Sequence, residues 1–370
     1  MAGNACATQP RGSVWGMDLG INLGYWGTAG TDDLAAMKEL CKAADRTGYR
    51  VAWLAEAYGS DVPSLAAYLS AFTSNLEWGS AVFQIPARTP AMTAMTAATL
   101  DKITGGRFRL GLGVSGPQVS EGWHGVRFDD PLGRTREYVD IIRLALGRKN
   151  VEYHGKHFEL PLPDGPGKAL RLLLLPQRAQ VPIYLAAIGP KNMELTGEIA
   201  DGWLGIFVSP EHLPEQLGRL RAGRERAGHE GGALDGFDVC ASAGLSIADD
   251  LDTGADRLRD NAALYIGGMG SRAKNFYNAL ARRMGFDDAA QEVQDLYLNR
   301  KHRDAAAAVP RDFIDRTALI GPREHIAERL HAYADAGVTT LSVSPVGDNL
   351  PERIAALHTL ADIMDAEGLR

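Results

Sequence analysis

The glycine-rich segment 111–116 (GLGVSG) has the spacing of a ligand-binding motif. Its G-x-G-x-x-G pattern matches the dinucleotide fingerprint, and Asp129 or Asp130 follows at about the required distance. That fingerprint requires the last glycine to lead directly into a helix, whose N-terminus binds the phosphate. Here Pro117 and a mixed loop follow, and the next helix is expected at about Arg134. We therefore interpret the segment as a loop after a strand, either contacting a ligand through its backbone or forming a tight turn.

Two other predicted strands end in residues that could bind an anion. In the segment 185–191 (LAAIGPK), small residues and Pro190 lead from a strand into a helix. The free amides and partial positive charge of that helix N-terminus suit a phosphate or a carboxylate. The segment 80–88 (SAVFQIPAR) places Gln84 and Arg88 just beyond a strand. Arg88 could bind an anion in bidentate fashion, although a loop arginine is more often solvated.

The histidine and cysteine patterns do not indicate a metal site. His154 and His157 lie on either side of a Gly-Lys turn without further ligands nearby, so we interpret them as a solvated turn. Cys6, Cys41 and Cys240 are far apart and form no C-x-x-C pair. This pattern argues against a disulfide framework and a structural zinc site, and it is typical of a protein in a reducing cytoplasm.

Short apolar runs that read as strands alternate with helix-length amphipathic stretches that would position these residues. Strands are expected at residues 18–26, 51–55, 77–83, 108–113, 182–187, 202–207, 238–246 and 339–344. Parallel strands need helical crossovers, and about eight right-handed crossovers close an α/β chain into a (β/α)8 TIM barrel. A doubly wound open sheet remains the alternative, because the number of strands does not distinguish the two architectures.

Length and composition fit one such barrel with insertions. The chain has 370 residues, of which 45% are hydrophobic, which is enough for a large core. We expect a disordered N-terminal arm at residues 1–16 and a single TIM-barrel domain at 17–370. Insertions are expected at about 147–180, containing a hairpin (VEYHGKHFEL), and at about 247–316, which is largely helical. The glycine-rich part of the second insertion, 267–277, is either a mobile lid or a loop between helices.

The charge balance excludes several classes of function. Lys and Arg number 39 against 46 Asp and Glu, so the formal net charge is −7. That balance gives no electrostatic footprint for nucleic acid or an anionic membrane. No apolar run approaches the roughly 20 residues of a membrane span, and the N-terminus lacks the pattern of a secretory signal. We expect a cytoplasmic protein that acts on a small molecule.

Taken together, five segments resemble the luciferase-like monooxygenase superfamily. They are 55–60 (AEAYGS), 84–90 (QIPARTP), 104–113 (TGGRFRLGLG), 121–125 (EGWHG) and 186–190 (AAIGP). The match runs from about Gly16 to Val343, and the GGRF segment with its spacing to the AxGP segment is quite specific. More narrowly, the chain is similar to the branch that uses the deazaflavin coenzyme F420, with FMN as the alternative cofactor.

The resemblance implies a bacterial luciferase-like barrel and assigns a cofactor site to it. Ala81–Val82 on the third strand is where the family's non-prolyl cis peptide would support the cofactor ring from behind. The segments 113–116 and 187–189 would line the phosphate-bearing tail. The candidate cofactor-binding residues are Ser80, Ala81, Val82, Gln84, Arg88, Gly113, Val114, Ser115, Gly116, Ala187, Ile188, Gly189 and Pro190.

The proton-transferring residue departs from the family pattern. Several relatives place an acidic residue and then a histidine after the second strand, but here Glu56 is followed by Ala57. Where some relatives have a catalytic glutamate in the glycine loop, this chain has Pro117. The catalytic candidates are Glu56, Tyr58 and His124. For Glu56 the alternative is a structural carboxylate that accepts hydrogen bonds from backbone amides beneath the cofactor.

Three functional hypotheses follow. The first is an F420-dependent oxidoreductase that transfers a hydride between the deazaflavin and a small organic substrate. The second is an FMN-dependent luciferase-like monooxygenase, and the third is a non-catalytic ligand-binding barrel, suggested by the missing histidine. The family resemblance also implies a homodimer. The sequence does not identify the substrate or the direction of hydride transfer.

Overall fold

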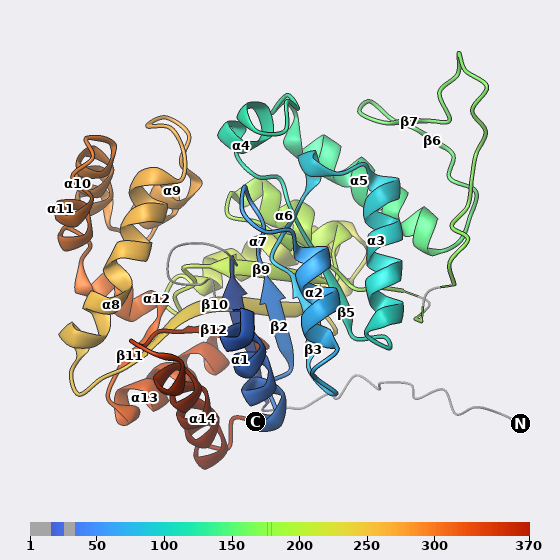
Figure 1. The fold of residues 1–370 in the computed structure, drawn as a ribbon. Coiled ribbons are helices and arrows are strands. Elements are labelled where there is room, and N and C mark those ends of the chain that lie inside the picture. Colours follow the sequence, from blue (N-terminus) through green and yellow to red (C-terminus); the bar gives the residue numbers. More distant parts are fainter. Residues whose placement is uncertain (1–15, 26–33, 176, 179) are drawn as a thin grey trace, which may run out of the picture.

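The computed structural model describes residues 16–25, 34–175, 177–178 and 180–370, and its central feature is a closed barrel of eight parallel strands (Figure 1). The expected disordered arm lies outside the described residues except for Gly16. The barrel strands are β1 (Asp18–Gly24), β2 (Val51–Leu54), β3 (Glu77–Ser80), β5 (Phe108–Gly113), β8 (Ile183–Ala186), β9 (Gly202–Ile206), β10 (Asp238–Ile247) and β12 (Thr340–Pro345).

The sheet closes because its last strand pairs with its first. β12 pairs with β10 on one side and with β1 on the other, and every barrel pairing is parallel. Closure excludes the doubly wound open sheet and confirms the (β/α)8 barrel. In Figure 1 the carboxyl ends of β1 and β2 point upward, toward the side on which α4 stands.

Helices on the outside of the barrel connect the strands, as the alternating pattern predicts. They are α1 (Leu34–Thr47), α2 (Val62–Ser70), α3 (Pro90–Ile103), α5 (Pro131–Leu146), α6 (Pro190–Ile199), α7 (Leu213–Arg226), α13 (Arg323–Ala336) and α14 (Leu350–Ala366). Several of them begin with a proline, whose fixed φ angle suits the first helical turn. Asp61 and Thr89 cap α2 and α3 by accepting hydrogen bonds from the backbone amides of Ser64 and Met92.

The segment between β10 and β12 forms a helical insertion with its own apolar cluster. It contains α8 (Leu251–Ala263), a π-helical turn (Leu264–Gly268), α9 (Phe276–Arg283), α10 (Asp287–Leu298), α11 (His302–Ala307) and α12 (Arg311–Thr317). Val293, Phe313 and Ile314 are fully or almost fully buried in this cluster, which is separate from the main core of the barrel. The first insertion carries the predicted hairpin as β6 (Tyr153–His154) and β7 (Glu159–Leu160).

Three details of the sequence-based interpretation were wrong. We expected the next helix at about Arg134, but a six-residue helix, α4 (Pro117–Gly122), begins directly after Gly116. The glycine segment therefore does lead into a helix, and the closed barrel is what excludes a dinucleotide-binding fold. The third strand is divided into β3 and β4 (Phe83–Gln84), and a short strand, β11 (Leu319–Gly321), pairs with the end of β10.

A network of charged side chains fills the floor of the barrel, at the amino ends of its strands. The Arg109 guanidinium donates to Glu77, to Asp238 Oδ2 at 2.9 Å and to the Tyr184 hydroxyl at 2.9 Å. Arg50 pairs with the other oxygen of Glu77. Burial alone would raise the pKa of Glu77, but Arg109 and Arg50 together hold it below its usual value. This network closes the barrel at the end opposite the candidate site.

No helix among the described residues is long and apolar enough to cross a membrane.

Candidate active site

The candidate site lies at the carboxyl ends of the barrel strands, where TIM-barrel enzymes build their active sites. The peptide between Ala81 and Val82 is cis, as the resemblance implied, and it separates β3 from β4. β5 packs directly against this segment. A Cβ atom at Gly111 would lie 1.8 Å from the Ser80 carbonyl oxygen, and one at Gly113 would lie 2.6 Å from Val82 Cγ2. The glycines of β5 are therefore required for the close approach to the cis peptide.

Glu56 is held by four donors at the end of β2. Its carboxylate forms a bidentate ion pair with Arg88, in which the Nη2–Oε2 distance is 3.1 Å. It also accepts hydrogen bonds from the backbone amides of Val62 at 3.1 Å and Gln84 at 3.4 Å. Only 8% of the Glu56 side chain and 17% of the Arg88 side chain is exposed. These contacts agree with the hypothesis that Glu56 is a structural carboxylate. They also engage the Arg88 guanidinium, which the sequence analysis considered as a group for binding an anion.

Gln84 connects Glu56 to His124. Its Nε2 donates to the Glu56 backbone carbonyl at 2.9 Å, and its Oε1 lies 2.7 Å from His124 Nε2. Gln84 is almost fully buried, whereas His124 is half-buried in the loop that follows α4. Burial lowers the pKa of His124, and Arg88 acts in the same direction, while Glu56 opposes both. The structure therefore brings together Glu56, Gln84, Arg88 and His124, which lie up to 68 positions apart in the sequence.

Tyr58, the third catalytic candidate, lies apart from that network, and 65% of it is exposed. It interacts electrostatically with Tyr25, which follows β1, and with Tyr265 of the helical insertion. Burial first, and then interactions with Tyr265 that include a hydrogen bond, raise the pKa of Tyr25. The Tyr265 and Tyr277 rings lie edge to face with their centroids 4.8 Å apart.

The sequence analysis missed this tyrosine cluster. Tyr265 and Tyr277 belong to the insertion, and nothing in their local sequence indicates that they meet the end of β1. Asn275 holds the two together: its Nδ2 donates to the carbonyls of Tyr265 and Ile266 at 3.0 Å each, and its Oδ1 caps α9. The one available signal was the glycine-rich segment 267–277, which begins two residues after Tyr265 and ends at Tyr277.

Two backbone segments at the carboxyl ends of β5 and β8 could contact an anion. In the loop 113–116, Ser115 has a left-handed conformation with φ of 61°. Among the described residues, a Cβ atom at Gly189 would meet nothing within 4 Å, and no side chain caps the ten-residue helix α6 that begins just after it. The first amides of α6 are thus available to an anion. Arg283 at the end of α9 donates to the Ile188 carbonyl at 3.1 Å, which adds a cation beside this loop.

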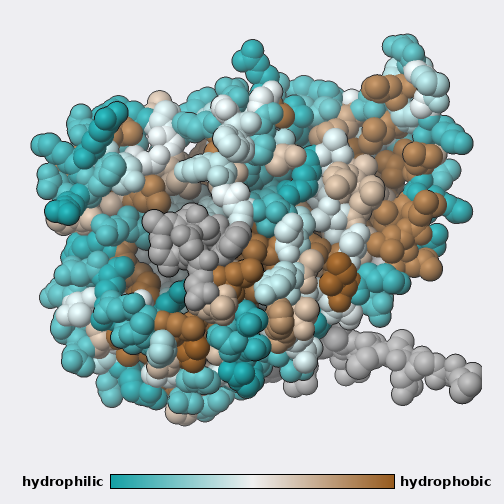
Figure 2. All heavy atoms as spheres, in the orientation of Figure 1, coloured by the Kyte–Doolittle hydropathy of each residue, from teal (hydrophilic) through white to brown (hydrophobic). Residues whose placement is uncertain are grey.

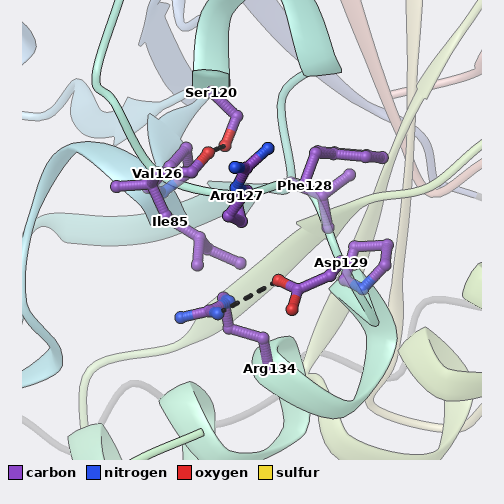
Figure 3. Close-up of a pocket in the computed structure, with 10 residues that line it drawn as sticks. Ile85, Ser120, Val126, Arg127, Phe128, Asp129 and Arg134 are labelled. Atoms are coloured by element: carbon purple, nitrogen blue, oxygen red, sulfur yellow. Dashed lines mark hydrogen bonds and ion pairs between the residues drawn. The ribbon is translucent and has the colours of Figure 1, made fainter.

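A small pocket of about 20 Å³ lies behind the glycine loop (Figure 3). Ile85, Val126 and Phe128 supply apolar walls, and the Arg134 side chain points toward Asp129 with an Nη2–Oδ1 distance of 3.4 Å. This volume holds about one water molecule. The pocket is therefore too small for a cofactor or a substrate, and the carboxyl ends of the barrel strands remain the candidate site.

The histidines of the first insertion have protein partners. His154 Nδ1 lies 2.5 Å from Glu159 Oε1, and His157 Nε2 lies 3.0 Å from Asp130 Oδ2. The backbone amides of Lys156, His157 and Phe158 donate to the Glu137 carboxylate. Within the described ranges, no group of three or more His, Cys, Asp or Glu side chains could hold a metal ion.

Known proteins resemble this chain over nearly its whole length. A family model of luciferase-like monooxygenases matches residues 17–340. A protein of Mycobacterium tuberculosis, provisionally named a coenzyme F420-dependent oxidoreductase, is 40% identical over 354 residues, covering 92% of this chain and 99% of its own.

Solved structures with this fold include enzymes that use either cofactor. The coenzyme F420-dependent tetrahydromethanopterin reductase of Methanopyrus kandleri has a TM-score of 0.77 and 24% identity, covering 94% of this chain and 97% of its own. The oxygenating component of a Pseudomonas putida 3,6-diketocamphane monooxygenase, solved with FMN, has a TM-score of 0.67 and 20% identity, with 94% and 97% covered. Identities this low show a shared fold and leave the choice of cofactor to other evidence.

Proposed function

Since the chain belongs to the luciferase-like monooxygenase family, we propose that it is a coenzyme F420-dependent oxidoreductase that transfers a hydride between the deazaflavin and a small organic substrate. The observation that carries this proposal is the 40% identity to the mycobacterial relative over 92% of the chain, since that relative is named as F420-dependent. The cis peptide at Ala81–Val82 and the glycines packed against it support a flat ring at the mouth of the barrel.

The chain's own residues would bind and orient the cofactor, which when bound supplies a hydride-carrying ring carbon. The backbone of 113–116 and the free amides of α6 suit the anionic tail. Because the net charge of the chain is −7, this binding relies on local positive potential, and Arg283 beside Ile188 contributes to it. Glu56 and Arg88 neutralise each other and hold the ends of β2 and β4 together.

The tyrosine cluster supports a carbonyl or hydroxyl compound as the substrate. Tyr25, Tyr265 and Tyr277 present aromatic surface near the mouth of the barrel, and a phenol hydroxyl can donate to a carbonyl oxygen. Burial raises the pKa of Tyr265 and of Tyr277 to about 12, so both hydroxyls keep their protons at neutral pH. A small ketone that accepts a hydride at carbon would need such a donor at oxygen.

The alternative is a monooxygenase that uses reduced FMN and oxygen. The Pseudomonas putida neighbour is named a monooxygenase and was solved in complex with FMN. An anaerobic assay separates the two. The protein is mixed with reduced F420 and a panel of small ketones, and the absorbance of oxidised F420 is followed. Oxidation that depends on the ketone and proceeds without oxygen supports the proposal. Turnover only with reduced FMN and oxygen would contradict it.

We also propose a homodimer formed through α2 and α3. These neighbouring helices and the turn after α2 expose large apolar side chains: Tyr68 (45% exposed), Phe72 (39%), Met92 (51%), Met95 (52%) and Ile103 (55%). Figure 2 shows further apolar side chains at the right of the molecule, over the segment between β7 and β8. Exposed apolar patches of this kind mark interaction sites. Light scattering after size-exclusion chromatography should give twice the monomer mass, and Met95→Glu should reduce it to the monomer.

We further propose that the protein is cytoplasmic. Cys41 and Cys240 are buried free thiols, which suits a reducing compartment. Fractionation of the source cells tests this, with the protein expected in the cytoplasmic fraction.

A further inference from the structure

Gln84 has hydrogen-bond partners that determine how its amide group is oriented. A backbone carbonyl has no hydrogen to donate, so the group that faces the Glu56 carbonyl at 2.9 Å must be the Gln84 NH2 group. The Gln84 oxygen then necessarily faces His124 Nε2 at 2.7 Å. The reverse orientation would place two acceptor oxygens against each other. The Gln84 amide is therefore fixed by its partners rather than by an arbitrary choice between nitrogen and oxygen.

The same reasoning assigns the proton on the His124 ring. The Gln84 oxygen can only accept, so the ring nitrogen facing it must carry a hydrogen. A neutral imidazole has one N–H group, which leaves Nδ1 with a free lone pair. Among the described residues, Gln84 is the only hydrogen-bond partner of this ring. Nδ1 is consequently the atom at which His124 gains and loses a proton.

We propose that Gln84 is a positioning residue that fixes His124 as the Nε2–H tautomer and makes Nδ1 the proton-exchanging atom of the active site. This inference rests on the proposed function. It assigns to His124 the role of acid or base, which Ala57 cannot fill in the position where several relatives have a histidine. In the reductive direction, Nδ1 would first take up a proton from water and then give it to the substrate oxygen as the hydride adds to the carbonyl carbon. The neutral imidazole then remains.

The charged groups around His124 agree with a neutral ring at rest. Glu56, after β2, favours the protonated imidazole, whereas Arg88, after β4, opposes it. Because Arg88 and Glu56 form an ion pair, their effects on the ring largely offset each other. Burial then lowers the pKa of His124 from its usual value. A ring that is neutral at pH 7 and has a free Nδ1 is ready to accept a proton in the oxidative direction.

Nitrogen-15 NMR of the cofactor-free protein, labelled on histidine, tests this assignment. His124→Gln identifies the signals of His124 by their loss. At pH 7.5 we expect a neutral ring with a slowly exchanging proton on Nε2 and none on Nδ1. A proton on Nδ1, or on both nitrogens, would overturn the inference. Because no cofactor is present, this result is independent of whether F420 binds.

Gln84→Met keeps the approximate length of the side chain but removes both hydrogen bonds. We expect the Nε2–H signal to broaden into exchange with water and the limb of the kcat–pH profile assigned to His124 to shift. A matched control is Gln294→Met, since Gln294 is equally buried but lies on α10 in the separate apolar cluster of the insertion. The control should leave the His124 signals unchanged. An unchanged Nε2–H signal in Gln84→Met would overturn the role of Gln84, and the wild-type spectrum tests the tautomer even if this variant does not fold.

Discussion

Replacing Glu56 by glutamine separates a structural carboxylate from a catalytic one. In the wild type both carboxylate oxygens accept hydrogen bonds, from Arg88, Val62 and Gln84. The amide that replaces the carboxylate keeps one acceptor oxygen and turns an NH2 group toward donors that need an acceptor. The variant therefore leaves the Arg88 guanidinium without its counter-ion, although only 17% of that side chain is exposed.

The expected loss of stability follows from that burial. Breaking a buried ion pair by removing one partner costs about 3–5 kcal/mol. Because both side chains retain some exposure, the lower end of that range applies, and we expect about 3 kcal/mol. In a chain of this size, each 1 kcal/mol lowers Tm by roughly 2 °C, so Tm should fall by about 6 °C.

Urea unfolding followed by tryptophan fluorescence measures this loss, and a double-mutant cycle assigns it to the pair. Arg88→Met alone should also destabilise the protein, whereas Glu56→Gln combined with Arg88→Met should lose less than the sum of the two. If Glu56→Gln instead kept full stability and lost all activity with F420 affinity unchanged, Glu56 would be a catalytic residue and this reasoning would be refuted.

Three further predictions concern other parts of the molecule. Arg109→Met should lower the unfolding free energy by about 3–5 kcal/mol, because Asp238 loses its paired cation and Glu77 keeps only Arg50. A loss below about 1 kcal/mol in urea would contradict this. The pKa of Glu77 is lower in the folded protein than its unfolded value of 4.5, so ionised Glu77 stabilises the fold fully above pH 4.5. This stabilisation is lost as pH falls through the folded pKa, and the urea midpoint should therefore decrease below about pH 4.5. A urea midpoint that stays constant down to pH 3 would argue against it. Gly113→Ala should weaken F420 binding about tenfold, roughly 1.4 kcal/mol, because the new Cβ atom would displace the Val82 side chain. A fluorescence titration measures this affinity, and an unchanged value would show that the contact does not shape the site.

Much of the fold could be predicted from the sequence because its signals are local. The alternation of apolar strands and amphipathic helices gave the eight barrel strands, and Pro190 marked the start of α6. β11 and α4 were missed because three and six residues are too short to show a period. The sequence showed Pro117 only as an interruption, whereas in the structure it occupies the first turn of α4.

The candidate site was harder to predict because its contacts join distant segments. Glu56 and Arg88 were singled out separately, as an acid and as an anion-binding residue, but nothing in the sequence indicates that they neutralise each other. Gln84 and His124 are 40 positions apart, and their hydrogen bond depends on the loop after α4. Tyr265 meets Tyr25 after β1 although the two residues are 240 positions apart in the sequence. The cis peptide was located through family resemblance and not through any local signal.

Parallel titrations of the purified protein with coenzyme F420 and with FMN, followed by fluorescence quenching, test the central claim most directly. The proposed function predicts saturable binding of F420 and negligible binding of FMN, with F420 affinity reduced in Gly113→Ala. Tight binding of FMN with negligible binding of F420 would contradict the claim, and binding of neither would favour a barrel without cofactor chemistry.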